Sequence, residues 1–386
     1  MGTAEMAGKK LTVVQMLPAL EGGGVERGTL EVARALMHAG HRSIVISAGG
    51  RMVEQLLTQG SEHLCRDVGH KSLFTARHIW FLRRYLQENQ VDILHLRSRL
   101  PAWIGYLAWK GMPVGQRPHL VTTVHGLYSV KRYSAIMNCG EKVIAVSETV
   151  RKYLVANYPR LDQSRVVVIP RGIDADAFPY GYQAPQAWLD SWYQEYPQLK
   201  NQQVLTLPGR ITRLKGHHDF IDLIATLHKS GQRIYGIIVG GEDKRRKRYA
   251  EEVGRHIADA GLNDYIVMTG ARFDIKAIYS VSDIVLSLSS KPESFGRSVL
   301  EALSLGRPVV GYDYGGAGEL LRILYPHGGV PSGQASLLPE KIMGILQGGS
   351  EPVADGHPYE LSVMLDTTIS LYESLCDTAP DGYSSR

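Results

Sequence analysis

The chain has 386 residues, of which 44% are hydrophobic and 21% are charged, so it has a globular composition and is long enough for two domains. No apolar run reaches the roughly eighteen residues of a membrane-spanning helix, and the first ten residues lack the apolar core of a signal peptide. The three cysteines, Cys65, Cys139 and Cys376, have no metal-like spacing and are expected to be free thiols of a cytoplasmic protein.

The net charge of +5 is distributed unevenly along the chain. Between Arg66 and Lys152 there are fourteen Lys and Arg residues against five Asp and Glu, a surplus of nine, so the remainder of the chain is net acidic. This segment predicts an anionic partner, such as a membrane surface, a phosphorylated lipid or a nucleic acid. Scattered solvated charges are the alternative explanation.

The first half of the chain alternates apolar strands with amphipathic helices. Strands are predicted at 11–17, 43–47, 93–96, 120–124, 142–146 and 166–169, and helices at 25–39, 102–110 and 149–158. Such alternation with short loops predicts a doubly wound parallel sheet, whose ligands bind beyond the carboxyl ends of the strands. Two of those ends are distinctive, the glycine loop 22–24 and the histidine of 123–126, although a plain turn and a structural histidine would produce the same patterns.

The segment 169–178 follows, and it contains the Asp-x-Asp pair Asp174 and Asp176. Carboxylates at this spacing can bind a divalent metal, but a Pro/Gly-rich turn is a poor setting for such a site, and we predict none. The following stretch to Lys200, rich in Tyr, Trp, Gln and Pro, is interpreted as a linker and the entry to the second domain.

The second half repeats the alternation. Strands are predicted at 204–207, 234–239, 266–270, 284–288 and 308–311, and helices at 219–228, 244–260, from 297 onwards, 337–346 and 359–375, with a glycine loop at 315–318. Arg210 and Lys215 flank the loop before the first of these helices, where two cations could hold a diphosphate or remain simply solvated. The basic run Lys244–Arg248 is interpreted as a solvated helix face.

Glu293 and Glu301 stand eight residues apart, one in a loop and one in the helix that follows it. From the spacing alone, they could bind two hydroxyl-rich parts of one ligand or be two solvated glutamates beside a capped helix. The segment 293–301, Glu-Ser-Phe-Gly-Arg-Ser-Val-Leu-Glu, resembles the Glu-x7-Glu signature of the retaining glycosyltransferases of GT-B architecture, family 4. Three further motifs resemble that family in the same order: Gly-Gly-Val-Glu at 23–26, Thr-Val-His-Gly at 123–126, and Gly-Arg-x4-Lys-Gly at 209–216.

The resemblance implies an α/β protein with two Rossmann-like domains, each built on a doubly wound parallel sheet, facing a central cleft. We expect an acceptor-binding domain over 1–180, a nucleotide-sugar-binding domain over 181–358, and a last helix at about 359–378 that packs back on the first domain.

The resemblance also implies roles for individual residues. The catalytic positions are Arg210 and Lys215, which would neutralise the departing diphosphate, Glu293, which would hold the donor sugar, and His125, which would position that sugar. The implied donor-binding positions are Gly23, Gly24, Ser294, Phe295, Gly296, Arg297 and Glu301, the last accepting hydrogen bonds from the ribose. The sequence offers no clear carboxylate nucleophile, so we expect front-face attack with retention, without a metal or other cofactor.

The acceptor is expected to be anionic. Arg97, Arg99, Lys131 and Arg132 would supply cations, and the stretch 97–103 resembles that of bacterial transferases that build the lipopolysaccharide core. We therefore expect transfer of a hexose from a UDP- or GDP-linked sugar to an anionic saccharide or lipid-linked acceptor of that core, with peripheral contact at the inner membrane and no nucleic-acid partner. Another glycan or lipid acceptor is the alternative.

Functions from other classes of protein fit the sequence less well. A nucleotide-sugar 2-epimerase shares the GT-B architecture but would show its own acid/base carboxylates in place of the Glu-x7-Glu block. A dinucleotide-dependent oxidoreductase would need Gly-x-Gly-x-x-Gly after the first strand, where the chain has Glu-Gly-Gly-Gly-Val-Glu. A non-catalytic sugar-binding module would not need Arg210 and Lys215.

Overall fold

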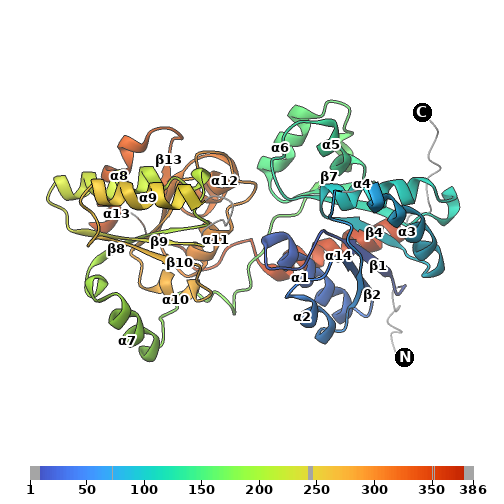
Figure 1. Ribbon diagram of the computed structural model, residues 1–386, viewed down its shortest axis with the longest axis horizontal. Helices are drawn as coiled ribbons and strands as arrows, with labels where there is room; N and C mark the ends of the chain where they lie inside the picture. The colour runs from blue at the N-terminus through green and yellow to red at the C-terminus, as the bar shows by residue number, and fades with distance from the viewer. Residues whose placement is uncertain (1–8, 72, 242–246, 350, 352, 378–386) are drawn as a thin grey trace, which may run out of the picture. The chain divides into compact units, whose positions relative to one another are not determined.

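The computed structural model describes residues 9–71, 73–241, 247–349, 351 and 353–377, and the chain forms two compact units. The first unit contains the chain up to Pro170 together with the segment from Ser362 onwards, and the second contains Arg171–Leu361. Each unit is a parallel sheet with helices on both faces, so the predicted doubly wound α/β fold is confirmed (Figure 1). Among the described residues, no helix is both long and apolar enough to cross a membrane.

The first unit has a seven-stranded sheet in the order β3-β2-β1-β4-β5-β6-β7. Its strands are β1 (Thr12–Met16), β2 (Arg42–Ser47), β3 (Glu62–Cys65), β4 (Ile93–Leu96), β5 (His119–Val124), β6 (Lys142–Ala145) and β7 (Val166–Val168). Its helices are α1 (Gly24–His38), α2 (Val53–Thr58), α3 (Arg77–Glu88), α4 (Arg99–Lys110), α5 (Arg132–Ala135), α6 (Glu148–Asn157) and α14 (Leu361–Asp377). Apolar side chains of α3, α4 and α6 form the core on one face, and those of α1 and α2 pack on the other.

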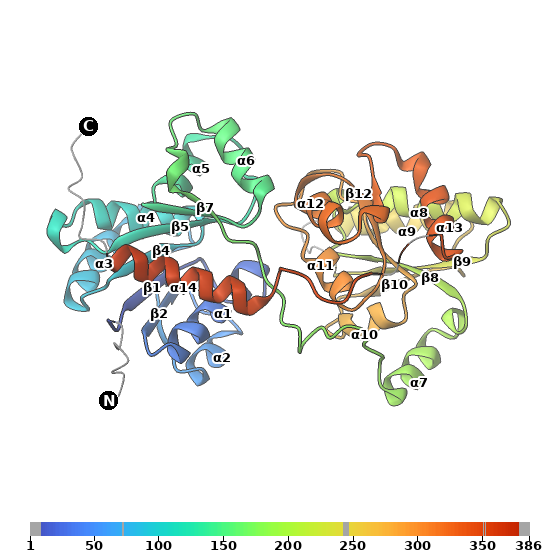
Figure 2. The ribbon, with the colours of Figure 1, turned by 180° about the vertical axis from the view of Figure 1, so that it is seen from behind.

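Helix α14 lies along the sheet of the first unit, across β1 and β4 (Figure 2), and it meets a layer of polar side chains there. The Tyr372 hydroxyl lies 2.6 Å from Nδ1 of His95, whose Nε2 lies 2.6 Å from Oγ1 of Thr123. Burial raises the pKa of Tyr372 well above its ordinary value, so this hydroxyl stays protonated. Because buried polar groups of this kind need partners, the layer fixes the register of α14 on the sheet.

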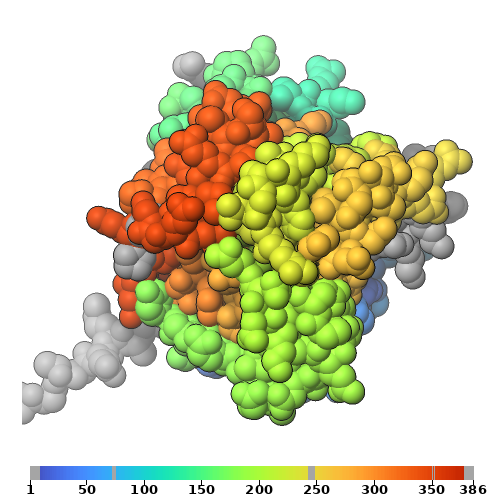
Figure 3. All heavy atoms as spheres, turned by 90° about the vertical axis from the view of Figure 1, so that its left-hand side faces the viewer, coloured from blue at the N-terminus to red at the C-terminus, as the bar shows by residue number. Residues whose placement is uncertain are grey.

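The second unit has a six-stranded sheet in the order β10-β9-β8-β11-β12-β13. Its strands are β8 (Gln203–Pro208), β9 (Ile234–Val239), β10 (Ile266–Gly270), β11 (Ile284–Ser287), β12 (Val309–Tyr312) and β13 (Gly329–Val330). Its helices are α7 (Gln186–Glu195), α8 (His217–Lys229), α9 (Lys247–Asp259), α10 (Ile275–Ser280), α11 (Arg297–Ser304), α12 (Gly315–Leu324) and α13 (Leu338–Leu346). Helices α8, α9 and α13 cover one face, and α7, α10, α11 and α12 cover the other. Figure 3 shows α8 and α9 side by side at the surface.

One sequence interpretation is corrected by the second unit, and another gains detail. The stretch to Lys200, interpreted as a linker and the entry to the second domain, contains α7, whose Trp192 is buried against β8 and β9. The predicted glycine loop 315–318 is instead the first turn of α12, where only glycine can lie so close to the loop before α11. Of the basic run Lys244–Arg248, the first three residues lie outside the described residues, and α9 begins at Lys247.

Candidate functional site

Three loops come together at the carboxyl edge of the second sheet, after β8, β11 and β12. The amide of Ser290 donates to the carbonyl of Leu214 at 2.9 Å, which joins the loop after β11 to the loop after β8. The amide of Gly316 donates to the carbonyl of Glu293 at 2.7 Å, which joins the loop after β11 to the start of α12. The edge is the place where ligands of parallel α/β sheets bind, and these contacts make it one continuous surface.

Glycine is required at two of these junctions. Gly216 has φ of +73°, and a Cβ there would lie 2.1 Å from the carbonyl oxygen of Leu288. Gly296, the residue before α11, has φ of +102°, and a Cβ there would lie 2.8 Å from Cα of Ala317. Both conformations are strained for any other residue, so the two glycines allow the loops to close on one another.

An ion pair between Lys215 and Glu293 links the loops after β8 and β11 at this edge. Lys215 Nζ donates to Glu293 Oε1 at 2.7 Å, and the Ser289 hydroxyl donates to the same oxygen. Burial alone would raise the pKa of Glu293, but the ammonium of Lys215 and the hydroxyl of Ser289 bring it below the ordinary glutamate value. Glu293 is therefore ionised at neutral pH, and among the described residues no hydrogen bond is made to its second oxygen, Oε2.

Arg210 lies in the same loop as Lys215 but is exposed. Its side chain makes no hydrogen bond or ion pair with any other part of the chain that the structure describes. A guanidinium without a protein partner, beside an ammonium and at a helix entrance, is a suitable group for binding a phosphate.

The Glu-x7-Glu block continues into α11. Glu301 is 8% exposed, and Oε1 accepts a hydrogen bond from Nε of Arg297, four residues earlier, at 2.9 Å. Ser294 and Gly296 lie in the loop at the N-terminus of α11, whereas the Phe295 side chain is part of the core. A helix N-terminus carries backbone N–H groups and partial positive charge, which favours an anionic ligand at this loop.

Several residues of this site carry no motif in the sequence. Ser289 is one, and its signal was only its place at the end of β11, four residues before Glu293. His217, the first residue of α8, is another. It is fully buried, and burial lowers its pKa to about 4. Asp219 in the first turn of α8 accepts a hydrogen bond of 2.5 Å from Tyr312 of β12, which ties that helix to the sheet.

The predicted positions in the first unit lie after β5 and at the start of α1. His125 directly follows β5, and Gly23 precedes α1. A Cβ on Gly23 would lie 2.2 Å from Oε2 of Glu26. The carboxylate of Glu26, in the first turn of α1, therefore folds over the N-terminus of that helix. The roles of His125, Gly23 and Gly24 stay predictions.

The predicted acceptor cations divide into a buried one and a surface group. Arg97 is 3% exposed and donates to Gln15 Oε1 at 2.9 Å, so its guanidinium is held inside the first unit, and its role towards an acceptor stays a prediction. Its neighbour two residues on, Arg99, lies over the rings of Tyr128 and Tyr133, 4.7 and 5.5 Å from their centroids.

The segment that carries the other two cations is attached to α4. Nε1 of Trp103 donates to the carbonyl of Tyr133 at 3.1 Å. Lys131 and Arg132, which directly precede Tyr133, are exposed. The structure therefore brings Arg99 together with the segment of Lys131 and Arg132.

The structure offers no cluster of metal ligands, since among the described residues no three His, Cys, Asp or Glu side chains gather in a way that could hold an ion. In the Asp-x-Asp pair, Oδ1 of Asp174 accepts the backbone N–H of Asp176 at 3.0 Å, so this carboxylate stabilises its own turn.

Comparisons with known proteins agree with this architecture. Residues 22–177 match the family model Glycosyltransferase Family 4, and residues 190–352 match Glycosyl transferases group 1. A D-inositol 3-phosphate glycosyltransferase of Kineococcus radiotolerans is 24% identical over 340 residues, covering 82% of this chain and 75% of the relative. The crystal structure of a glycosyltransferase from Rickettsia africae superposes with a TM-score of 0.83 and 29% identity, covering 96% of this chain and 100% of that one. Anabaena HepE in complex with UDP and glucose has the same fold, with a TM-score of 0.79 and 18% identity over 94% of this chain and 100% of that one.

Proposed function

The chain is a glycosyltransferase in which a Family 4 domain precedes a group 1 domain, and we propose that it transfers a hexose from a nucleotide sugar to an anionic acceptor with retention of configuration. The observation that carries the proposal is the grouping of Arg210, the Lys215–Glu293 pair and the N-terminus of α11 at one edge of the second sheet. These groups are the ones that a sugar diphosphate requires, namely cations for the phosphates and an ionised carboxylate for the sugar.

The cations would act on the leaving group. As the bond between the anomeric carbon and the diphosphate breaks, negative charge grows on the phosphate oxygens, and Arg210 and Lys215 would stabilise it. Fixed charges that face developing charge are often the largest single contribution to catalysis. In this proposal the two side chains supply the positive charge that a metal ion supplies in other transferases, so the reaction needs no metal.

Glu293 would hold the donor sugar rather than attack it. Lys215 and Ser289 both bond to Oε1, which leaves Oε2 to accept a hydrogen bond from a sugar hydroxyl. A carboxylate held in this way by an ammonium is a weak nucleophile, so a covalent intermediate on Glu293 is disfavoured. Front-face attack, in which the departing phosphate oxygen takes the acceptor proton, accounts for retention without a nucleophile.

The acceptor is proposed to bind the first unit. The group formed by Arg99, Lys131 and Arg132 favours an anionic acceptor, and the likeness of 97–103 to lipopolysaccharide core transferases favours a saccharide of that core at a membrane surface. The name of the Kineococcus relative indicates a phosphorylated cyclitol as the competing acceptor. Both acceptors share the negative charge on which the proposal depends.

The test is release of the nucleotide from a panel of UDP- and GDP-linked hexoses, with and without phosphorylated saccharide acceptors. We expect one donor to release its nucleotide, faster when an acceptor is present, and NMR of the product to show the anomeric configuration of the donor. The Arg210→Ala variant is the matched control and should release little. Inverted product, or no release from any donor, contradicts the proposal.

A further inference from the structure

The loop between β8 and α8 carries a third cation, Arg213, between Arg210 and Lys215. Unlike Arg210, its guanidinium is held by another part of the chain. Nη1 and Nη2 of Arg213 donate to the two carboxylate oxygens of Glu252 at 2.9 and 2.5 Å. Glu252 lies on α9, the helix beside α8 in Figure 3. A pair of parallel hydrogen bonds fixes the plane and the direction of a guanidinium, so this contact anchors the loop to α9.

An aromatic ring of α9 supports the same guanidinium from its flat side. Cζ of Arg213 lies 4.9 Å from the centroid of the Tyr249 ring, which is within the range of a cation–π contact. Tyr249 is 4% exposed and belongs to the core of the second unit, and its hydroxyl lies 3.4 Å from Nδ1 of His217 at the start of α8. The ring is therefore a rigid support. With a carboxylate at its edge and a ring below it, the Arg213 guanidinium has one defined orientation.

The carboxylate of Glu252 is suited to this contact. The hydrogen bonds from Arg213 bring the pKa of Glu252 below its ordinary value, so the carboxylate is ionised at neutral pH. Its Oε1 also lies 3.1 Å from Nε2 of His218, so one side chain of α9 contacts both the loop and the first turn of α8. The Arg213 side chain is 67% exposed, and ion pairs at such positions contribute only about 0–1 kcal/mol to stability. What this pair determines is the place of the loop.

The backbone contacts of the loop lie on either side of Arg213. The amide of Ile211 donates to the carbonyl of Gly241 at 3.1 Å, and the carbonyl of Leu214 accepts from the amide of Ser290 at 2.9 Å. Arg213 adds an attachment between these two points, towards α9. Arg210 and Lys215 stand three residues before and two residues after it, so their positions depend on the segment that it holds. Charges fixed before the ligand arrives need no reorganisation during the reaction.

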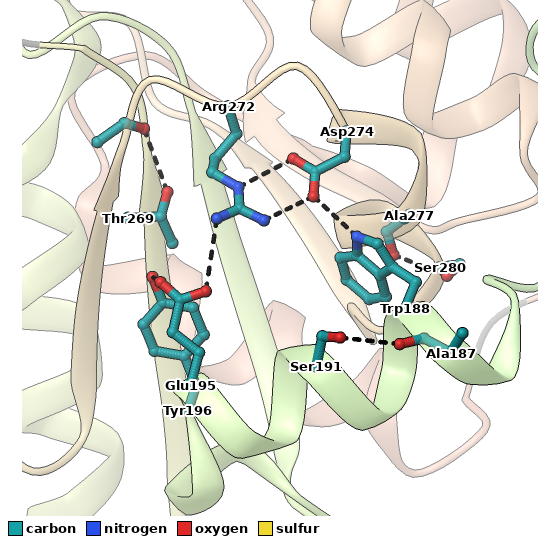
Figure 4. Close-up of polar contacts among 11 residues, drawn as sticks. Ala187, Trp188, Ser191, Glu195, Tyr196, Thr269, Arg272, Asp274, Ala277 and Ser280 are labelled. Atoms are coloured by element: carbon teal, nitrogen blue, oxygen red, sulfur yellow. Dashed lines mark hydrogen bonds and ion pairs between the residues drawn. The ribbon is translucent and has the colours of Figure 1, made fainter.

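The second unit attaches another loop of the same sheet edge to a helix in a similar way (Figure 4). After β10, Nε and Nη2 of Arg272 donate to the two oxygens of Asp274 at 2.9 and 2.6 Å. Nη1 of Arg272 lies 3.6 Å from Oε2 of Glu195 on α7, and its Cζ lies 5.5 Å from the centroid of the Trp192 ring of that helix. In both places a guanidinium that lies over a helix ring and pairs with a helix carboxylate joins a loop to that helix.

We propose that Arg213, Tyr249 and Glu252 form a clasp that holds the loop between β8 and α8 in the conformation required for the reaction. All three are positioning residues, because they act through Arg210 and Lys215 and do not themselves touch the diphosphate. The inference rests on the proposed function and deepens it. None of the residues predicted for the site lies on α9, yet this helix would determine where the two cations stand.

The experiment measures amide hydrogen exchange and kcat/KM in the same variants of the whole protein, with the nucleotide sugar that releases its nucleotide. Arg213→Ala and Glu252→Gln should each speed exchange of the Ile211 and Lys215 amides, because the loop opens more often. Each should lower kcat/KM by about 10- to 100-fold, the cost of misplacing a reacting group by about 1 Å. The midpoint of urea unfolding should not change, whereas a merely structural role would lower it and spare kcat/KM in the folded protein.

The double variant Arg213→Ala with Glu252→Gln tests whether the two residues act together. Both single changes open the same clasp, so the double variant should lose no more kcat/KM than Arg213→Ala alone. Arg213→Lys keeps the charge without the paired N–H groups and should behave like Arg213→Ala. Tyr249→Phe keeps the ring and should resemble the wild type.

The matched control is Arg42→Ala in the first unit. It removes another paired contact between an arginine and a glutamate, in which Nε and Nη2 of Arg42 donate to the two oxygens of Glu62 at 2.6 and 3.0 Å. Both measurements should stay at their wild-type values in this variant.

The outcomes separate the inference from the function on which it rests. Unchanged exchange in Arg213→Ala, or losses that multiply in the double variant, overturns the clasp. Faster exchange with unchanged kcat/KM overturns the positioning role, and so does full activity of Arg213→Lys, which would make Arg213 a simple charge contact. A wild type that releases nucleotide from no donor overturns the proposed function and the positioning role, while the exchange rates still decide whether the clasp holds the loop.

Discussion

Replacing Lys215 with Ala should impair both catalysis and stability, because its ammonium has two tasks. As a contact to the departing diphosphate it should contribute about 2–4 kcal/mol to the transition state, or roughly 30- to 1,000-fold in kcat/KM. As the partner of Glu293 it compensates a carboxylate whose side chain is only 23% exposed. An uncompensated charge at such a site costs about 1–3 kcal/mol, which corresponds to a lower melting temperature of the second unit by about 2–4 °C for each kcal/mol.

The pH dependence identifies the origin of the lost stability. In the wild type the pKa of Glu293 lies below its unfolded value, so the pair contributes stability above that value and loses it as the pH falls. In Lys215→Ala the burial of the carboxyl, which raises its pKa, is opposed only by the hydrogen bond from Ser289. The difference in the free energy of unfolding should therefore be largest at pH 7, shrink as the pH falls below the ordinary glutamate value, and vanish only where the carboxyl is protonated in the folded wild type as well.

Urea unfolding at pH 7 and pH 4, together with kcat/KM, measures both effects. Lys215→Ala combined with Glu293→Gln removes the unpaired charge and should recover the stability at pH 7 but not the activity. Arg210→Ala is the matched control from the same loop, and it should lose activity with the free energy of unfolding within about 0.5 kcal/mol of the wild type, since its side chain is exposed. If Lys215→Ala unfolds like the wild type at pH 7, or if Glu293→Gln does not rescue it, the pair does not stabilise the site.

The other predictions concern an internal histidine, the metal and the acceptor. His217 is held uncharged with a pKa of about 4, so the free energy of unfolding should fall by about 3 kcal/mol from pH 6.5 to pH 4, and urea titrations of His217→Gln should lack this decline. Activity should persist in excess EDTA, and strict dependence on added magnesium or manganese would contradict the cation-based mechanism. Removing Arg99, Lys131 and Arg132 together should weaken association with anionic vesicles by roughly 100-fold at low salt and much less at high salt, with nucleotide affinity unchanged as the control. Equal vesicle binding by this triple variant would show that the basic group is only a solvated surface.

The sequence predicts the strands best and the contacts between loops least. The bounds of β4 and β9 agree with their apolar runs, because central strands of a parallel sheet are buried on both faces. Helix α7 escaped notice because its buried face is made of large aromatic rings within a stretch rich in Gln and Pro. No local pattern shows that Lys215 meets Glu293, 78 residues away, since only the strand order brings their loops together.

The basic stretch after β4 shows that the sequence also does not reveal which of two nearby side chains is buried. Arg97 and Arg99 look equivalent in the sequence, and both were expected to face an anionic acceptor. The structure buries Arg97 against Gln15 and leaves Arg99 on the rings of two tyrosines. Charge counts along a sequence therefore overstate the cations that a surface presents, because a position beside a strand end can point into the protein.

The path of the chain through its two units determines the order in which they can be completed during synthesis. The second unit is inserted between two parts of the first, and its entry and exit are hydrogen-bonded to each other, with the amide of Leu361 donating to the carbonyl of Ile173 at 2.8 Å. During synthesis every residue of the second unit is therefore made before Ser362–Asp377 of α14. The hydrogen bond between Tyr372 and His95 can form only after that. The nascent second unit can close on itself while the first is still missing a helix, so loss of Ser362–Asp377 would damage the domain that was made first.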